Sequence, residues 1–385
     1  MTLPSRSSVP ALLAAALVVL ALAGALLGVE EQAEVAGLFA VTAAAVALAR
    51  YFRLAAPLGK AASEHPNVLG VSCIVGVLIL AAVFREDHFP LLLLASVLLY
   101  ATACLGLNIQ FGYVGIVNFA GASFFGIGGY TAAVLANGST PHLFILALGG
   151  VMASLISCVL LLPVLRTRGH YAALVTIAFA TLFRSFLEVN DTLGGPQGLK
   201  IPSLRVFGWD LGEGIAFGDV ELSFYANYVF FALVLCALAF VVVRRLERSW
   251  MGVAMDMVRI DEVAASVYGI SVARQKIFAF MLGNLLVGVA GAVYGMMTGY
   301  VAPNNFTFAD SLILVSMILL GGVGNVWGIF PAAALILILP EKLQFIQEYR
   351  FLLYGIVIIF ILLFRSQGLL PRGVRRFFPE READA

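Results

Sequence analysis

The chain has 385 residues, of which 62% are hydrophobic and only 12% are charged, with a formal net charge of +1. Soluble domains carry about twice that charged fraction, so the composition excludes an ordinary soluble protein. The small net charge also provides no basic surface of the kind that binds nucleic acid.

Apolar runs of about 20 residues recur along the chain, and runs of this length match a hydrocarbon layer roughly 30 Å thick. We therefore predict an all-α fold, a polytopic helical membrane protein with roughly 10–12 transmembrane or half-membrane helices. The expected apolar segments are 9–28, 35–50, 67–84, 90–108, 117–136, 143–165, 171–187, 224–243, 277–300, 311–339 and 351–364.

Two of these segments depart from a simple span. The first follows Arg6 and imitates a signal peptide. Its apolar run exceeds the usual cleavable core of about 7–15 residues, so we predict an uncleaved first span. The sequence Gly321–Asn325 interrupts segment 311–339, which is therefore either two short half-helices or spans, or one long broken helix.

The basic residues predict the topology. Most of the 23 lysines and arginines fall in connections on the same side as the N-terminus, so the positive-inside rule places both termini in the cytoplasm. The predicted organisation is a set of N-terminal transmembrane helices (1–88), a core of further transmembrane helices (89–372) and a cytoplasmic tail (373–385). The core contains a long inner connection (244–276), and no soluble domain is expected.

The ionisable residues indicate no chemistry of their own. The four cysteines lie inside apolar runs and the four histidines near their ends, without the spacing of metal ligands. No span carries a central acidic residue, which argues against a proton-coupled carrier. The chain contains no Gly-x-x-x-x-Gly-Lys-Ser/Thr phosphate loop, so it cannot hold ATP phosphates in that manner. We expect no catalytic residue, metal or cofactor in this chain.

The inner connection carries the most informative stretch, Arg259–Gly269. It predicts two short helices over roughly 250–258 and 261–268. Asp261 caps the second helix, Glu262 complements its dipole and Gly269 suits a left-handed closing position. Ala264 and Ala265 are expected to leave one face nearly flat for the approach of another backbone. This pattern favours docking to a soluble partner; the alternative is a helix lying on lipid headgroups, which its acidic start suits poorly.

The residues Glu262, Ala264, Ala265 and Gly269 resemble the Glu-Ala-Ala loop of ABC importer permeases, with Val263 inserted as a departure from the tighter motif. More specifically, the chain resembles the M-type inner-membrane permease subunit of the branched-chain amino acid ABC transporters, over about 90–372. Further segments that carry the likeness are Pro163–Tyr171, Thr192–Gly198, Gly269–Ile270, Lys276, Ala279–Phe280, Phe306–Ser311, Leu320–Gly324 and Arg365–Pro371.

The resemblance implies a transporter in the bacterial inner membrane with several subunits. Two homologous permeases would associate with two cytoplasmic ABC ATPases, which bind ATP, and with an external solute-binding protein. This chain would be a transport subunit without an ATPase site of its own. The residues expected in the ATPase-coupling loop are Arg259, Asp261, Glu262, Ala264, Ala265 and Gly269.

A translocation path is expected beside breaks in the spans, because irregular backbone at membrane depth is tolerated only against protein or a watery cavity. Broken helices also expose helix termini that bind a zwitterion. The residues expected along the path are Asn108, Asn118, Ser123, Gly126, Gly128, Gly129, Asn284, Gly322 and Gly324. Packing alone is an equally open explanation. The glycines at 283, 291, 295 and 299 favour close helix packing over a role in the path.

The opposite side offers two candidates. Arg184 and Glu188 are four residues apart on one helix face, which suits either an interfacial salt bridge or a pair flanking the outer entrance. The turn Gly194–Gly198 predicts a tight, ordered cap that either contacts a binding protein or is an ordinary turn.

The favoured function is the permease of an ATP-driven importer for branched-chain or other hydrophobic amino acids, working by alternating access. A close variant is a permease for urea, short amides or another small polar solute. An ion-coupled secondary transporter and an intramembrane enzyme are the remaining classes, and the enzyme is weakened because no His, Asp and Glu cluster falls inside adjacent spans.

Overall fold

The computed structural model describes residues 8–29, 66–138, 140–166, 170–217 and 220–342, with residues 34, 37, 38, 349, 352, 354–356, 359, 363, 368–370 and 372. Nearly all of the predicted segment 35–50, most of segment 351–364 and the whole tail 373–385 lie outside these residues.

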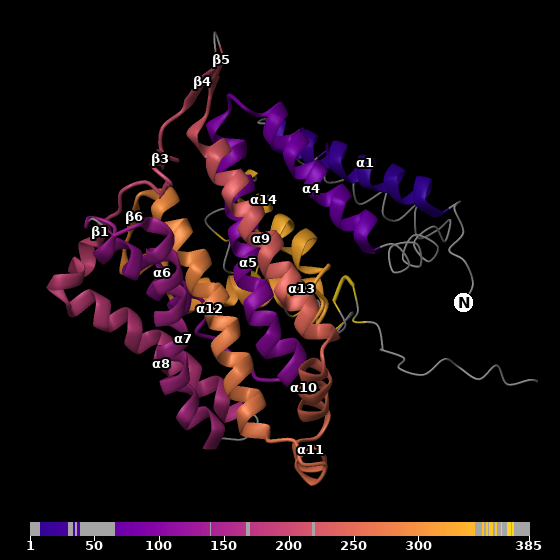
Figure 1. The fold of residues 1–385 in the computed structure, drawn as a ribbon, viewed down its shortest axis with the longest axis vertical. Coiled ribbons are helices and arrows are strands. Elements are labelled where there is room, and N and C mark those ends of the chain that lie inside the picture. The colour runs from indigo at the N-terminus through magenta and orange to yellow at the C-terminus, as the bar shows by residue number, and fades with distance from the viewer. Residues whose placement is uncertain are drawn as a thin grey trace, which may run out of the picture. The chain divides into compact units, whose positions relative to one another are not determined.

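The described residues form long helices joined by short loops and two-residue or three-residue strands (Figure 1). Six of the described helices are long and apolar enough to cross a membrane, and three shorter apolar helices accompany them, so the predicted fold class is confirmed. The helices are α1 (Ser8–Gly28), α4 (Pro66–Val83), α5 (His88–Asn108), α6 (Gly121–Leu135), α7 (His142–Arg166), α8 (His170–Val189), α9 (Phe224–Arg248), α10 (Trp250–Ile260), α11 (Glu262–Val267), α12 (Val272–Thr298), α13 (Phe308–Gly321) and α14 (Ile329–Lys342).

The chain divides into two packed units that interleave along the sequence. Unit 1 comprises 1–98, 203–237 and 337–350, and unit 2 comprises 99–202, 238–336 and 351–385. The predicted boundary between 88 and 89 stays a prediction, because these units follow packing and not chain order.

In unit 1, α1 packs against α4, and the end of α1 is closed by a buried lysine. Lys342 Nζ donates hydrogen bonds to the carbonyl oxygens of Leu27 (2.7 Å) and Val29 (2.9 Å) and lies 5.5 Å from the centre of the Phe89 ring. A helix leaves its last carbonyls without amide partners, and a cation there also complements the helix dipole. Lys342 therefore satisfies the end of α1 in apolar surroundings.

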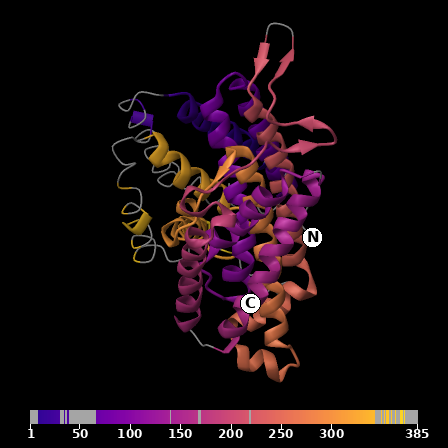
Figure 2. The same ribbon diagram turned by 90° about the vertical axis from the view of Figure 1, so that its left-hand side faces the viewer.

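Two hairpins belong to unit 1 and project at the end where α9 begins (Figure 2). Strands β2 (Arg205–Val206) and β3 (Trp209–Asp210) form one, and β4 (Ile215–Phe217) and β5 (Val220–Leu222) form the other. Partial burial raises the pKa of Asp210, but hydrogen bonds from Ser203, the Gly212 amide and Arg205 outweigh it, so the net pKa is lowered.

In unit 2, α12 runs through the middle and packs closely against α6 and α7 (Figure 1). Glycines make this possible. A Cβ added to Gly128 would lie 1.9 Å from the Gly288 carbonyl oxygen, and one added to Gly291 would lie 1.9 Å from that of Phe125. Without side chains between them, the backbones touch, as small residues allow in membrane helices.

The predicted packing role of the α12 glycines is confirmed for Gly283, which abuts the Gly106 carbonyl, and for Gly291. It is wrong for Gly299, which has φ 71° and closes the C-terminus of α12; among the described residues, an added Cβ would meet the Ile201 carbonyl oxygen at an ordinary contact distance of 3.8 Å. Sequence spacing alone placed Gly299 on the packing ridge, but the helix ends one residue before it.

The interrupted segment 311–339 is two helices, α13 and α14, each of 14 residues. Together with the turn before it, α13 belongs to the apolar stretch Pro303–Gly321, one of the six that are long enough to cross a membrane. A separate helix, α14, follows the break. The predicted break at Gly321–Asn325 is therefore confirmed. The second predicted break also appears, because α5 continues into the π-helix η1 (Ile109–Val114) and α6 begins only at Gly121.

The contact between α6 and α12 predicts the effect of a single methyl group. Gly291→Ala should lower the melting temperature of the detergent-purified chain, because overpacking costs about 1–3 kcal/mol. Gly355→Ala is the control, since an added Cβ at Gly355 has no neighbour within 4 Å in the part of the chain that the structure describes. Equal melting temperatures for the two variants would contradict the close packing.

Candidate functional site

The candidate site lies at one end of unit 2, where α10 and α11 form a short helical pair between α9 and α12 (Figure 1). Helix α10 packs against η1 and α12 as well as against α11. The two helices correspond to the pair that the sequence predicts over 250–258 and 261–268, with α10 two residues longer.

The local chemistry of α11 follows the prediction. The Asp261 carboxylate accepts hydrogen bonds from the amides of Val263 (2.8 Å) and Ala264 (3.0 Å), so it caps the helix. Gly269 has φ 79°, and the Ile270 amide donates to the Ala265 carbonyl oxygen, which closes the C-terminus. Glu262 forms an ion pair with Lys276 (2.7 Å), which ties α11 to the first turns of α12.

The expected flat alanine face is wrong. Ala265 is buried and Ala264 is exposed, because adjacent residues on a helix point about 100° apart. The exposed surface of the loop is instead apolar and bulky. Val263, Val267 and Tyr268 are 74–80% exposed, and Ile260 is 84% exposed. Among polar residues on a short capped helix, such a patch is typical of a surface that meets a partner.

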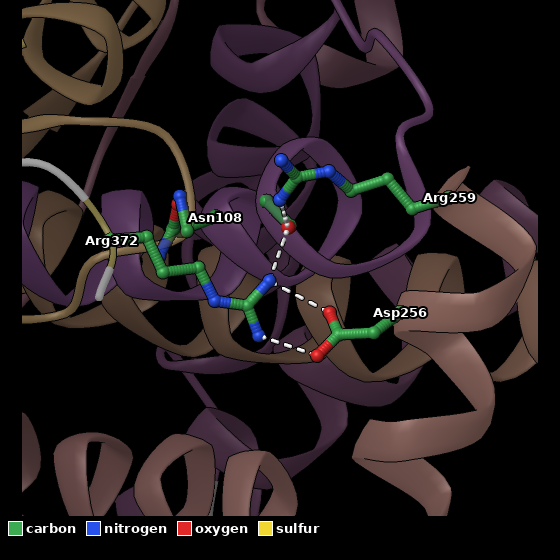
Figure 3. Close-up of polar contacts among 6 residues, drawn as sticks. Asn108, Asp256, Arg259 and Arg372 are labelled. Carbon is green, nitrogen blue, oxygen red and sulfur yellow. Dashed lines mark hydrogen bonds and ion pairs between the residues drawn. The ribbon is translucent and has the colours of Figure 1, made fainter. Parts of the chain in front are cut away.

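Figure 3 shows how α10 is joined to the break in α5. Arg259 Nη1 donates a hydrogen bond to the carbonyl oxygen of Gly112 in η1. Arg372 Nη1 donates to the same oxygen (3.2 Å) and also pairs with Asp256 on α10. One backbone carbonyl in the broken helix therefore receives two guanidinium groups.

The two breaks of unit 2 touch each other here. Asn108 Oδ1 accepts a hydrogen bond from the Gly324 amide (2.8 Å), and a Cβ added to Gly112 would lie 2.4 Å from Gly324 Cα. Gly322 and Gly324 have φ values of 107° and 85°, which only glycine adopts without strain. The predicted path residues Asn108, Gly322 and Gly324 are thus brought together, although a role in solute passage stays a prediction.

A second polar cluster is fully buried between η1 and α12. Asn118 Nδ2 donates to Gln110 Oε1 (2.8 Å) and to Asn284 Oδ1 (3.4 Å), and Gln110 Nε2 donates to the Phe280 carbonyl oxygen (3.4 Å). Within the described residues, Asn284 Nδ2 and Asn108 Nδ2 have no hydrogen-bond partner. Two amide groups able to donate hydrogen bonds therefore lie inside this part of the bundle.

The other predicted path residues lie elsewhere on α6. Ser123 is buried, and its hydroxyl has no partner among the described residues. An added Cβ on Gly126 would meet the Phe306 ring at 2.7 Å, and one on Gly129 would meet the Val301 side chain at 3.3 Å. Together with Gly128, these glycines make close contacts with neighbouring elements, and their place in a path stays a prediction.

The opposite end of unit 2 holds the predicted Arg184–Glu188 pair. Arg184 Nε lies 2.8 Å from Glu188 Oε1, and Arg184 Nη2 donates to Asn304 Oδ1 (3.1 Å). The pair therefore ties α8 to the 3-10 turn η4 (Pro303–Asn305).

The glycine turn is ordered, as predicted: Gly194, Gly195 and Gly198 all have positive φ. It leads into β1 (Leu199–Lys200), which pairs with β6 (Tyr300–Val301).

Sequence reasoning missed three residues that the structure brings into the site. Asp256 and Arg372 are separated by more than a hundred residues, and neither belongs to a local motif. Gln110 lies just beyond the predicted segment 90–108, and its amide, two residues after Asn108, was the one available signal. Polar residues inside a span usually face other protein groups.

Comparisons with known proteins agree on one family. The family model for the branched-chain amino acid transport system permease component matches residues 89–362. The chain is 29% identical to the high-affinity branched-chain amino acid transport system permease protein LivM of Salmonella typhimurium, covering 91% of this chain and 92% of that protein. It is 33% identical to the LivM protein of Escherichia coli, over 71% of this chain and 68% of that protein. The LivH permease protein of Escherichia coli is 25% identical, covering 71% and 91%. No solved structure matches the chain.

The buried amide cluster predicts a large stability effect. Asn118→Ala leaves the buried side-chain oxygen Oε1 of Gln110 and the backbone amide of Ala120 without their hydrogen-bond partner. An unsatisfied buried polar group costs about 1–3 kcal/mol. The melting temperature in detergent should fall clearly. Asn137→Ala, on an exposed residue at the end of α6, should leave it nearly unchanged. A smaller fall for Asn118→Ala than for Asn137→Ala would contradict the cluster.

Proposed function

Since the chain belongs to the family of branched-chain amino acid transport permease components, we propose that it is the transmembrane permease subunit of an ATP-driven importer. The proposed cargo is branched-chain or other hydrophobic amino acids. The chain would perform no covalent chemistry, and a separate ATPase would drive alternating access. The likeness to the two LivM proteins supports the cargo, because both carry branched-chain amino acid transport in their names.

The observation that carries this proposal is the construction of α10 and α11. The pair is capped, closed by Gly269 and tied to α12 by the Glu262–Lys276 ion pair, so it is stiff. It presents Val263, Val267 and Tyr268 outward. A stiff helix with an exposed apolar patch suits docking to a soluble ATPase and transmits the force of that contact, whereas a flexible loop would absorb it.

The solute path in this proposal follows the two breaks. Asn108 and Gly324 join them, and the Gln110, Asn118 and Asn284 amides lie close to the first. Broken membrane helices offer unsatisfied amide and carbonyl groups that bind the carboxylate and ammonium of an amino acid. Movement of α10 against η1 would change how these groups are paired, which supports a path that opens and closes with the ATPase.

The proposed assembly contains a second permease, two ATPases and an external solute-binding protein. The likeness to LivH as well as LivM supports a related permease partner, because both are permease proteins of branched-chain amino acid transport systems. The binding protein would meet the end of unit 2 that holds the Gly194–Gly198 turn and the Arg184–Glu188 pair. The membrane would be the bacterial inner membrane, with both termini in the cytoplasm.

The coupling role of α11 is testable with the complete transporter in vesicles. The double variant Glu262→Ala/Gly269→Ala removes the ion pair to α12 and strains the left-handed closing residue, so ATP-driven uptake of leucine should fall roughly tenfold. Assembly, measured by co-purification of all subunits, should remain. The control is Glu213→Gln, a change of an exposed acidic residue in the outer hairpin region. Unchanged uptake by the double variant would remove the coupling role from α11.

A further inference from the structure

The C-terminal segment returns to the site and is fixed there by its backbone. The Leu369 amide donates to the Leu320 carbonyl oxygen (2.7 Å), and the Leu370 amide donates to that of Gly321 (3.3 Å). The Leu370 carbonyl in turn accepts from Asn325 Nδ2 (3.0 Å). A Cβ added to Gly368 would lie 2.5 Å from Gly322 Cα. The segment therefore holds the break between α13 and α14 and presents Arg372 beside it.

The Arg372 guanidinium makes three different contacts, and Figure 3 shows the pair that it forms with Asp256. Nη1 and Nη2 pair with the two carboxylate oxygens of Asp256, at 2.7 Å and 2.9 Å. Nη1 also donates to the Gly112 carbonyl oxygen, and the guanidinium carbon lies 4.7 Å from the centre of the Tyr113 ring. The side chains of the ion pair are only 16% and 25% exposed. A bidentate, half-buried pair of this kind is stronger and more specific in geometry than a surface pair.

The Gly112 carbonyl is available to Arg372 because the helix is broken there. In a continuing α-helix it would accept from the amide of residue 116. The amides of Gly115 and Ile116 instead both donate to the Gln110 carbonyl oxygen. The Gly112 oxygen is left at the end of a helix, where the dipole favours a cation. Arg259 and Arg372 satisfy it, so the break in α5 is completed by one side chain from α10 and one from the C-terminal segment.

From these contacts we infer that Arg372 is a positioning residue that ties α10 to both breaks of unit 2, so that displacement of α10 moves η1 and the 322–325 loop together. This inference rests on the proposed function. Residues 368–370 and 372 of the C-terminal segment therefore take part in transmitting the movement of α10 to the two breaks. The Arg372–Asp256 pair is the link that connects this segment to α10.

A double-mutant cycle in the complete reconstituted transporter tests the link. The variants are Asp256→Asn, Arg372→Lys and the two combined, and the readout is the ratio of leucine taken up to ATP hydrolysed. Lysine keeps the charge but cannot make the bidentate contact and the carbonyl contact together. Each single variant should lower the ratio roughly tenfold, the equivalent of one charge-assisted hydrogen bond, and the combined variant should lower it no further.

The matched control is Arg244→Gln. Arg244 pairs with Glu247 at 2.9 Å in a similarly half-buried setting, but both residues lie on α9, so the pair joins no separate elements. This variant should keep the uptake ratio while losing a comparable amount of thermal stability. A merely structural role for Arg372 would lower the melting temperature in both cases and leave the uptake ratio unchanged in both, and that result would overturn the inference.

Two failures are distinguishable. If the unmodified transporter takes up leucine with ATP, and the Arg372 and Asp256 variants keep its ratio of leucine taken up to ATP hydrolysed, only the inferred role of the Arg372–Asp256 link is wrong. Additive effects of the two single variants would also overturn it, because they would show that the residues act separately. If the unmodified transporter shows no ATP-driven uptake, the proposed function is wrong, and so is the inference about the Arg372–Asp256 link that rests on it.

Discussion

The central constraint on unit 2 is that polar backbone must be satisfied inside an apolar bundle. Lipid supplies no hydrogen bonds, so a break in a membrane helix persists only where protein groups complete it. At the first break, the Gly112 carbonyl is completed by Arg259 and Arg372. At the second, the Gly324 amide is completed by Asn108. Each break is therefore stabilised by groups from distant parts of the chain, and a movement of those groups acts on the breaks.

Close glycine contacts supply the rigid frame around these breaks. At Gly128 and Gly291 the backbones of α6 and α12 touch, and Gly283 brings α12 against α5. There the helices are held together by direct backbone contact. At the end of unit 2 that holds α10 and α11, ion pairs and single hydrogen bonds join the elements instead.

Local signals in the sequence predicted much of this arrangement. The Asp261 cap, the closing Gly269, the Arg184–Glu188 pair and the break after Gly321 all depend on residues close together in the chain, whose preferences survive folding. The burial of Ala265 and the bond between Asp256 and Arg372 depend on which elements meet in three dimensions. Contacts between residues far apart in the chain leave no local sequence pattern, so these features could be found only from the structure.

The most direct measurement places purified permease subunits in vesicles with and without the ATPases and the solute-binding protein. Transport driven by an ATPase that acts on α10 and α11 predicts that leucine accumulates only when the ATPases and ATP are present. It also predicts that an imposed proton or sodium gradient has no effect. Accumulation by this chain alone, driven by such a gradient, would contradict a permease moved by a separate ATPase.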